Sequence, residues 1–135
     1  MIVAPTDPER AVAAVEAYVA AFAAGDARAA ANLYAPEGTV EDPVGAPVVS
    51  GAANIAAFYE RAMGMGLRLE RTGPVRVAGD SAAFPFRIHY PPTAERRLVE
   101  VIDTFRFDSE GRILEMRAFW GPANIQTSEE SSNHA

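Results

Sequence analysis

The segment VEVIDTFRF, residues 99–107, decides the fold class because its side chains alternate along its whole length. The odd-numbered positions are apolar apart from Asp103, whereas three of the four others are polar. A period of two predicts a β-strand, from about Leu98 to Phe107, with one face turned towards a core. Turn-forming residues follow at 108–111, and alternation resumes up to Trp120, which predicts an antiparallel neighbour.

Two further strands are predicted upstream. Val75 and Val77 alternate with a charged residue before a turn at Gly79–Asp80, and alternate apolar positions run from Phe84 to Tyr90. Pro85 falls inside this second run. Because proline cannot donate a hydrogen bond to a neighbouring strand, we expect this strand to lie at a sheet edge or to contain a bulge.

The N-terminal half has the spacing of helices instead. The first helix is capped by a hydroxyl or a carboxylate within Thr6–Glu9, and Gly25 ends it. The second is short and alanine-rich, is capped by Asp26, carries Tyr34 and must stop before Pro36.

A third helix is expected after an N-cap at Ser50, with an apolar face that includes Ile55, Phe58 and Tyr59. Helices followed by antiparallel strands are the pattern of α+β proteins. We therefore expect one domain over residues 1–125, with three helices packed on one face of a curved sheet. The polar tail over residues 126–135 is expected to be disordered.

Bulk composition excludes several classes of function. The chain of 135 residues is long enough for a core, 49% of it is hydrophobic, and no apolar stretch approaches the length of a membrane span. Its formal net charge of −6 argues against nucleic acid or an anionic membrane as a partner. The absence of cysteine excludes disulfides and thiolate chemistry, and no secretory signal is recognisable, so a cytoplasmic location is expected.

Asp103 is the first candidate for chemistry, since it lies on the apolar face of its predicted strand. An ionised carboxylate without a partner is costly there, so the neutral acid with a raised pKa is favoured. A neutral acid can donate a hydrogen bond, which a carboxylate cannot. The alternative is a structural acid paired with a buried arginine or with backbone amides, and the sequence leaves both open.

The segment TVEDPVG, residues 39–45, provides a second inward acid. If the chain is extended before Pro43, Asp42 shares the inward side with Val40, and Glu41 is the solvated member of the acid pair. An aspartate before proline is more commonly a simple turn residue.

Three polar side chains are nevertheless predicted to point inwards, namely Tyr18 on the first helix, Asp42 and Asp103. Polar groups that converge on an apolar cavity are the usual layout of a small-molecule site.

An ordered set of motifs resembles the bacterial Δ5-3-ketosteroid isomerases, members of the NTF2-like and SnoaL-like proteins. The similarity extends over roughly residues 8–125. The motifs are TVEDPVG (39–45), IAAFY (55–59), TGPVR (72–76), PFR (85–87), VID (101–103), RFDSEGRI (106–113) and AFW (118–120).

This resemblance implies a conical α+β fold, in which a curved, mixed and mainly antiparallel sheet and three helices enclose a deep apolar pocket. It implies a homodimer packed through the sheets and a steroid as the small-molecule substrate. The implied reaction moves the double bond of a 3-oxo-Δ5 steroid into conjugation by proton transfer from C4 to C6 through a dienolate. Such a reaction moves only protons and needs neither a metal nor a redox cofactor.

The resemblance also assigns roles by position. Asp42 matches the general base, and Tyr18 and Asp103 match the two hydrogen-bond donors to the C3 oxygen. Ketosteroid isomerases are themselves a known example of an oxyanion-hole aspartic acid kept neutral by an apolar site. Tyr34 and Tyr59 match supporting tyrosines, which would hydrogen-bond in series to Tyr18 and lower its proton affinity.

Further positions match the pocket wall of the family, although their residue types alone indicate no more than a core. These positions are Phe86, Val101, Met116 and Trp120. The spans 60–72 and 75–85 look slightly shorter than in the family, and the hairpin at 89–97 differs. The shape of the pocket mouth and the preferred steroid therefore stay open.

Other proteins on this scaffold are dehydratases, epoxide hydrolases, polyketide cyclases and proteins without catalytic activity. A dehydratase or cyclase would be expected to have an inward histidine, whereas His89 is predicted on a polar face and His134 in the tail. A carrier of apolar ligands is the alternative from another class, but it has no need for an inward carboxylate opposite two donors.

Overall fold

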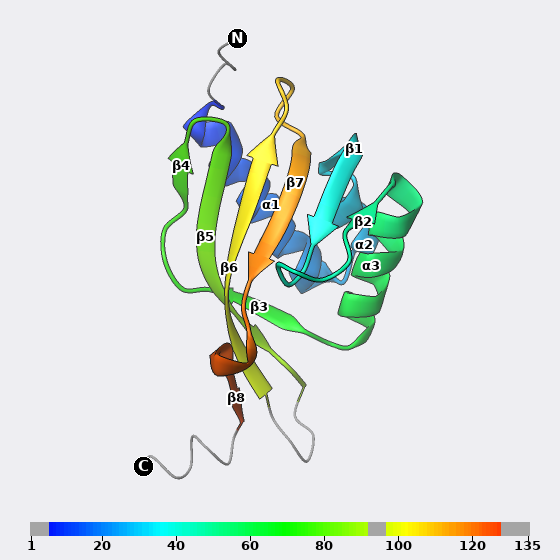
Figure 1. Cartoon of the computed structure of the whole chain (residues 1–135), viewed down its shortest axis with the longest axis vertical. Helices are drawn as coiled ribbons and strands as arrows, with labels where there is room; N and C mark the ends of the chain where they lie inside the picture. The colour runs from blue at the N-terminus through cyan, green and yellow to red at the C-terminus, as the bar shows by residue number, and fades with distance from the viewer. Residues whose placement is uncertain (1–5, 92–96, 128–135) are drawn as a thin grey trace.

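In the computed structural model, which describes residues 6–91 and 97–127, three helices pack on a mixed, mostly antiparallel sheet (Figure 1). The helices are α1 (Pro8–Ala24), α2 (Ala27–Ala31) and α3 (Ala52–Gly64), and η1 (Pro122–Asn124) is a single 3-10 turn. The strands are β1 (Tyr34–Glu41), β2 (Val49–Ser50), β3 (Arg68–Arg71), β4 (Arg76–Ala78), β5 (Ser81–His89), β6 (Arg97–Phe107), β7 (Ile113–Phe119) and β8 (Ile125–Thr127). The predicted α+β class is confirmed.

The order of strands in the sheet is β2-β1-β7-β6-β5-β3, with β4 also paired to β5 and β8 to β6. Strands β1 and β7 are parallel, and the other pairs are antiparallel. Because β1 and β7 run in the same direction with Glu41 opposite Arg117, the residues that follow the two strands emerge side by side. Helix α1 crosses behind the sheet, and α3 lies beyond β1 and β2 (Figure 1).

The ends of the first helix agree with the sequence prediction. The Asp7 side chain accepts a hydrogen bond of 3.0 Å from the Glu9 amide, and Gly25 ends the helix with a φ of 66°. Asp26 likewise caps α2 through the Ala29 amide, at 3.0 Å. Each short polar side chain satisfies an amide that the first helical turn leaves free.

Two helix predictions are wrong because strand pairing competes with the helix. Tyr34 is not helical: α2 ends at Ala31, and Tyr34 begins β1 opposite Ile113 of β7. Ser50 is not the cap of α3, because it pairs with Thr39 in β2, and Gly51 occupies the cap position without a side-chain hydrogen bond.

The prediction for Pro85 is also wrong, since β5 is an interior strand with an unbroken register to β6. On its other side, β4 pairs with residues 81–83 and β3 with residues 86–89. Pro85 lies in the gap between these two partners. No described strand is paired with β5 on that side at this position, so the N–H group that proline lacks leaves no ladder hydrogen bond unmade there. Its carbonyl still accepts a hydrogen bond of 3.1 Å from the Thr72 amide.

The core lies between the helices and the inner face of the sheet. Tyr18 of α1 packs edge-on against Phe84 and Phe105, with ring centroids 6.2 and 5.2 Å away. Asp103 is the one buried charged or polar residue within the described chain. No helix in the described ranges is long and apolar enough to span a bilayer.

The predicted tail begins later than expected. Gln126 and Thr127 belong to β8, where they pair with Leu98 and Arg97 of β6. The rest of that tail, with His134, and the hairpin tip at 92–96 lie outside the described residues.

Candidate active site

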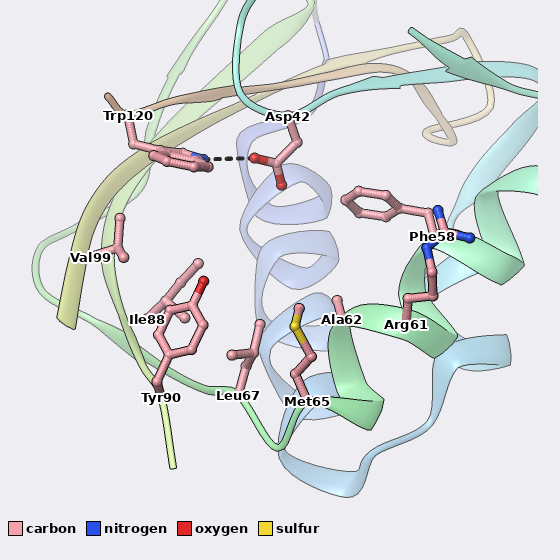
Figure 2. Close-up of a pocket in the computed structure, with 10 residues that line it drawn as sticks. All are labelled: Asp42, Phe58, Arg61, Ala62, Met65, Leu67, Ile88, Tyr90, Val99 and Trp120. Carbon is pink, nitrogen blue, oxygen red and sulfur yellow. Dashed lines mark hydrogen bonds between the residues drawn. The ribbon is translucent and has the colours of Figure 1, made fainter. Parts of the chain in front are cut away.

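Two adjoining cavities lie between α3, α1 and the inner face of the sheet. The inner one has a volume of about 40 Å³ and is lined at its base by Tyr18 and Asp103. The outer one has a volume of about 230 Å³ (Figure 2). Both are lined by Asp42, Phe58, Ala62, Leu67 and Ile88. Asp42 therefore lies at the junction, where one carboxylate can reach ligand atoms in either cavity.

Asp103 is held at the base of the inner cavity by β6. It pairs in register with Phe84 of β5 and Ala118 of β7, and only 1% of it is exposed. Within the described ranges, neither of its carboxyl oxygens has a hydrogen-bond partner. That observation contradicts the alternative of a structural acid paired with an arginine or with backbone amides.

The surroundings of Asp103 favour its neutral form. Burial raises the pKa of Asp103 well above its ordinary value, the Asp42 carboxyl adds to this, and the Tyr18 hydroxyl opposes it. A carboxylate there would be desolvated with no hydrogen bond or ion pair from the described residues to compensate, so the neutral acid is favoured. The proton remains available to a ligand, because no described residue accepts it.

Tyr18 comes from the buried face of α1 and lines the inner cavity next to Asp103. Burial, and then the Asp103 carboxyl, raise the pKa of the Tyr18 phenol well above its ordinary value, while the Tyr59 hydroxyl lowers it. Tyr18 is therefore a neutral O–H donor at neutral pH.

Tyr34 and Tyr59, the two tyrosines predicted to support Tyr18, are buried next to each other. Their hydroxyl oxygens are 2.5 Å apart, and the Tyr59 ring packs edge-on against the Tyr18 ring at a centroid distance of 5.9 Å. Neither residue lines the two cavities. Of the two tyrosines that were expected to lower the Tyr18 pKa, Tyr59 lowers it but Tyr34 raises it, and burial, the largest influence, also raises it.

Asp42 follows directly after β1 and is held by Trp120, the residue that follows β7. The indole Nε1 of Trp120 donates a hydrogen bond of 2.7 Å to its Oδ1 (Figure 2). Burial raises the pKa of Asp42 above its ordinary value, and the Trp120 hydrogen bond partly opposes this, because it stabilises the carboxylate. In the described part of the chain Oδ2 accepts no hydrogen bond, which leaves this oxygen free to take a proton.

Glu41, the other member of the acid pair, is not simply solvated. Its Oε2 accepts a hydrogen bond of 2.9 Å from the Gly45 amide, and its Oε1 pairs with Arg117 of β7 at 3.0 Å. These two contacts lower the pKa of Glu41. The two adjacent carboxylates therefore differ in surroundings. Glu41 is bound to the turn and to β7, whereas Asp42 faces the two cavities.

The remaining predicted wall residues divide into two groups. Phe86 and Val101 line the inner cavity, and Trp120 lines the outer one. Met116 lines neither: it is 1% exposed and pairs with Val40 and Phe105 in the core. His89 also lines neither cavity, and its Nε2 lies 2.8 Å from Glu70 Oε1.

Several other residues line the cavities although the sequence did not predict them as wall residues. On α3 and its C-cap these are Phe58, Arg61, Ala62 and Met65, and elsewhere they are Phe22, Leu67, Leu69, Ile88, Tyr90 and Val99. The α3 set has the spacing of one helix face, which is a signal that the sequence carries. Among the described residues, no group of three or more His, Cys, Asp or Glu side chains could hold a metal ion.

A polar cluster at the base of an apolar cavity, enclosed by helices and an unclosed mixed sheet, places the chain among the NTF2-like pocket proteins. Residues 15–116 match the SnoaL-like domain family, and the chain belongs to that family.

The chain is 44% identical over 113 residues to Steroid Delta-isomerase from Nocardioides simplex, an alignment that covers 84% of this chain and 91% of that protein. This similarity confirms the predicted resemblance and supports an isomerase function. A solved structure of SalBIII, described as an epoxide hydrolase/cyclase-like enzyme in pyran ring formation in the polyether salinomycin, superimposes with a TM-score of 0.82. It is 26% identical in sequence, and 90% of this chain and 98% of that one are covered.

Proposed function

We propose that the protein is a steroid Δ-isomerase, which converts 3-oxo-Δ5 steroids to conjugated 3-oxo-Δ4 steroids. The observation that carries this proposal is the arrangement of three groups around the inner cavity: two neutral donors, Tyr18 and Asp103, and the carboxylate Asp42. The relative that is named a steroid Δ-isomerase supports the same activity.

Asp42 acts as the base in this proposal. The C4 protons of the substrate are acidic because they lie between the carbonyl group and the double bond. The free Oδ2 of Asp42 removes one of them, and the resulting acid returns the proton to C6. The position of Asp42 in both cavity walls lets it serve two carbon atoms of one ligand with little movement.

Tyr18 and Asp103 stabilise the dienolate that forms when the proton leaves. Negative charge develops on the C3 oxygen, and each O–H donates a hydrogen bond to it. Both groups are almost completely buried, at 3% and 1% exposure, so water does not weaken these bonds. One oxyanion donor commonly contributes a factor of about 10²–10³ in rate. The protein itself supplies the donors and the base, so no cofactor takes part in the proton transfer.

The alternatives explain fewer of these features. A carrier of apolar ligands would lose stability by keeping an unpartnered acid in its core and would gain nothing from it. A dehydratase or cyclase that relies on an inward histidine finds no such group among the described residues, where His89 lines neither cavity.

The direct test is to mix the protein with 5-androstene-3,17-dione and to follow the ultraviolet absorbance of the conjugated enone. We expect the absorbance to rise far faster with the protein than with buffer alone. Binding of the steroid without any catalysed rise would favour a carrier instead.

We also propose a homodimer packed through the outer face of the sheet. On this face Ile102 and Phe119 are cross-strand partners and are 49% and 42% exposed. An exposed apolar pair in the middle of a sheet is typical of a surface that is covered in the assembly. Sedimentation of the wild type and of Phe119→Glu tests this: the wild type should sediment as a dimer and the variant as a monomer.

A further inference from the structure

One face of α3 forms the helical wall of the outer cavity. Residues 58, 61, 62 and 65 are spaced at i, i+3, i+4 and i+7, so they share that face. Three of them are apolar, and the fourth is Arg61. Figure 2 shows these side chains on α3 and at its C-terminal cap, opposite the wall that carries Trp120, Val99 and Ile88.

Among the described residues that line the outer cavity, Arg61 is the one cationic side chain. Within the described ranges it forms no ion pair, although the chain carries a net charge of −6. Other arginines do find carboxylates: Arg87 lies 2.5 Å from Glu100, and Arg112 lies 2.6 Å from Glu110. The hydrogen-bonding capacity of Arg61 is therefore available to a ligand.

In the described structure Arg61 forms no ion pair or hydrogen bond with the proposed base, Asp42. The pKa of Asp42 is shifted by burial and by the Trp120 hydrogen bond, and Arg61 is not among its causes. The position of Arg61 in the last turn of α3 gives it a favourable interaction with the helix dipole. That interaction uses the charge but none of the five N–H donors of the guanidinium group.

The proposed chemistry fixes how a steroid lies in the two cavities. Its C3 oxygen meets Tyr18 and Asp103 in the inner cavity, and C4 and C6 pass Asp42 at the junction. A rigid fused-ring molecule then extends its opposite end, ring D and the C17 substituent, into the outer cavity. Met65, Tyr90 and Arg61 line that cavity, and Arg61 and Met65 are exposed to solvent.

We propose that Arg61 recognises an anionic group at the C17 end of the substrate, so that the preferred substrates are 3-oxo-Δ5 steroids with an acidic side chain. This inference rests on the proposed isomerase function. A guanidinium group suits a carboxylate because two parallel N–H donors match its two oxygens. The apolar wall formed by Phe58, Ala62 and Met65 holds the ring system beside it.

The test compares 3-oxopregn-5-ene-20-carboxylic acid with its methyl ester, which differs only in the charge and one small group. Both are assayed by enone absorbance, and their conjugated Δ4 products are titrated into the protein by calorimetry. The wild type should prefer the acid by about tenfold in kcat/KM and in affinity. This is about the effect expected from one hydrogen bond to a charged group. This preference should shrink as the salt concentration rises.

The variants are Arg61→Gln, Arg61→Lys and, as a matched control, Arg28→Gln. Arg28 is also an exposed arginine in the last turn of a helix, but it lines neither cavity. In Arg61→Gln, kcat/KM and affinity should become nearly equal for the acid and the ester. Arg61→Lys should retain part of the preference for the acid, and Arg28→Gln should retain all of it. Far-ultraviolet circular dichroism confirms that each variant is folded.

The possible failures are distinguishable. Equal handling of acid and ester by the wild type, or a preference that survives Arg61→Gln, would overturn the role of Arg61 and leave the isomerase proposal intact. Preferential binding of the Δ4 acid through Arg61 without turnover of any Δ5 steroid would support anion recognition and overturn the isomerase proposal.

Discussion

The indole of Trp120 donates a hydrogen bond of 2.7 Å to the carboxylate of Asp42, which is 78 residues away in the sequence. The contact exists because β1 and β7 are parallel neighbours and the two residues follow the ends of these strands. Trp120 thereby fixes one oxygen of the proposed base and stabilises its charged form.

Removal of this donor should change the pH dependence of catalysis. A hydrogen bond to a carboxylate lowers its pKa, so Trp120→Phe should raise the pKa of Asp42 further above its ordinary value. Since only the carboxylate can act as the base, the acid limb of the plot of kcat/KM against pH should move to higher pH. A limb at an unchanged pH, measured with 5-androstene-3,17-dione, would show that Asp42 is not the titrating base.

Asp42→Asn should separate binding from chemistry. The amide has nearly the same shape as the carboxylate, so folding and steroid affinity should stay close to those of the wild type. Turnover should fall by about 10²–10⁴, the usual contribution of a general base. Steady-state kinetics and calorimetric titration with a Δ4 steroid give the two quantities. A variant with near wild-type turnover would require a different base.

Asp103→Leu should impair catalysis without loss of stability. It removes one donor to the C3 oxygen, so kcat should fall by about 10²–10³. It also removes the two buried oxygens without a partner and leaves an apolar group between Phe84 and Ala118, so the free energy of unfolding should not decrease.

The same variant tests the protonation state of Asp103. Because its folded-state pKa is raised, the unfolded chain loses the proton first, and the stability of the wild type falls as pH rises above the ordinary value of 3.8. Asp103→Leu and Asp103→Asn lack this loss, so their stability relative to the wild type should increase from pH 4 to pH 8. Urea unfolding at each pH provides the measurement. A relative stability that does not change with pH would mean that Asp103 is ionised in the folded protein.

Strand alternation was enough to predict that Asp103 faces the core. Asp103 stands among apolar partners at every second position of its strand, and a period of two fixes its face regardless of the neighbouring strands. The inward direction of Asp42 follows from the same rule applied to Val40, which is fully buried. Local sequence therefore carries both acids of the site.

The features that sequence could not predict depend on pairing between distant segments. Whether Tyr34 ends a helix or begins a strand is decided by Ile113, which lies on a strand much later in the chain. Pro85 is tolerated inside the sheet because β3 and β4 leave a gap at its position. Arg61 lies on the apolar side of α3, but a single cation on a helix face gives no signal until the opposite wall of the cavity is in place.

Glu41 explains why two carboxylates stand next to each other. It bonds to the Gly45 amide and to Arg117 of β7, and so closes the turn that follows Asp42 and ties it to the sheet. The Val44 amide adds a hydrogen bond of 2.9 Å to the Ala118 carbonyl. We expect Glu41 to be a positioning residue that sets where the free oxygen of Asp42 lies.

Glu41→Ala should therefore lower kcat by about tenfold or more, because small displacements of a reacting group have large effects on rate. KM should change little, since Glu41 lines neither cavity. Glu41→Gln, which can still accept one of the two hydrogen bonds, should recover part of the loss. Glu115→Ala is the matched control, because Glu115 is also a strand glutamate paired with an arginine. It lies on β7, and its partner is Arg106 at 3.9 Å, away from the turn. A comparable fall in kcat for Glu115→Ala would mean that Glu41 only supports the fold in general. The same conclusion would follow if the fall in kcat for Glu41→Ala were explained by a loss of thermal stability.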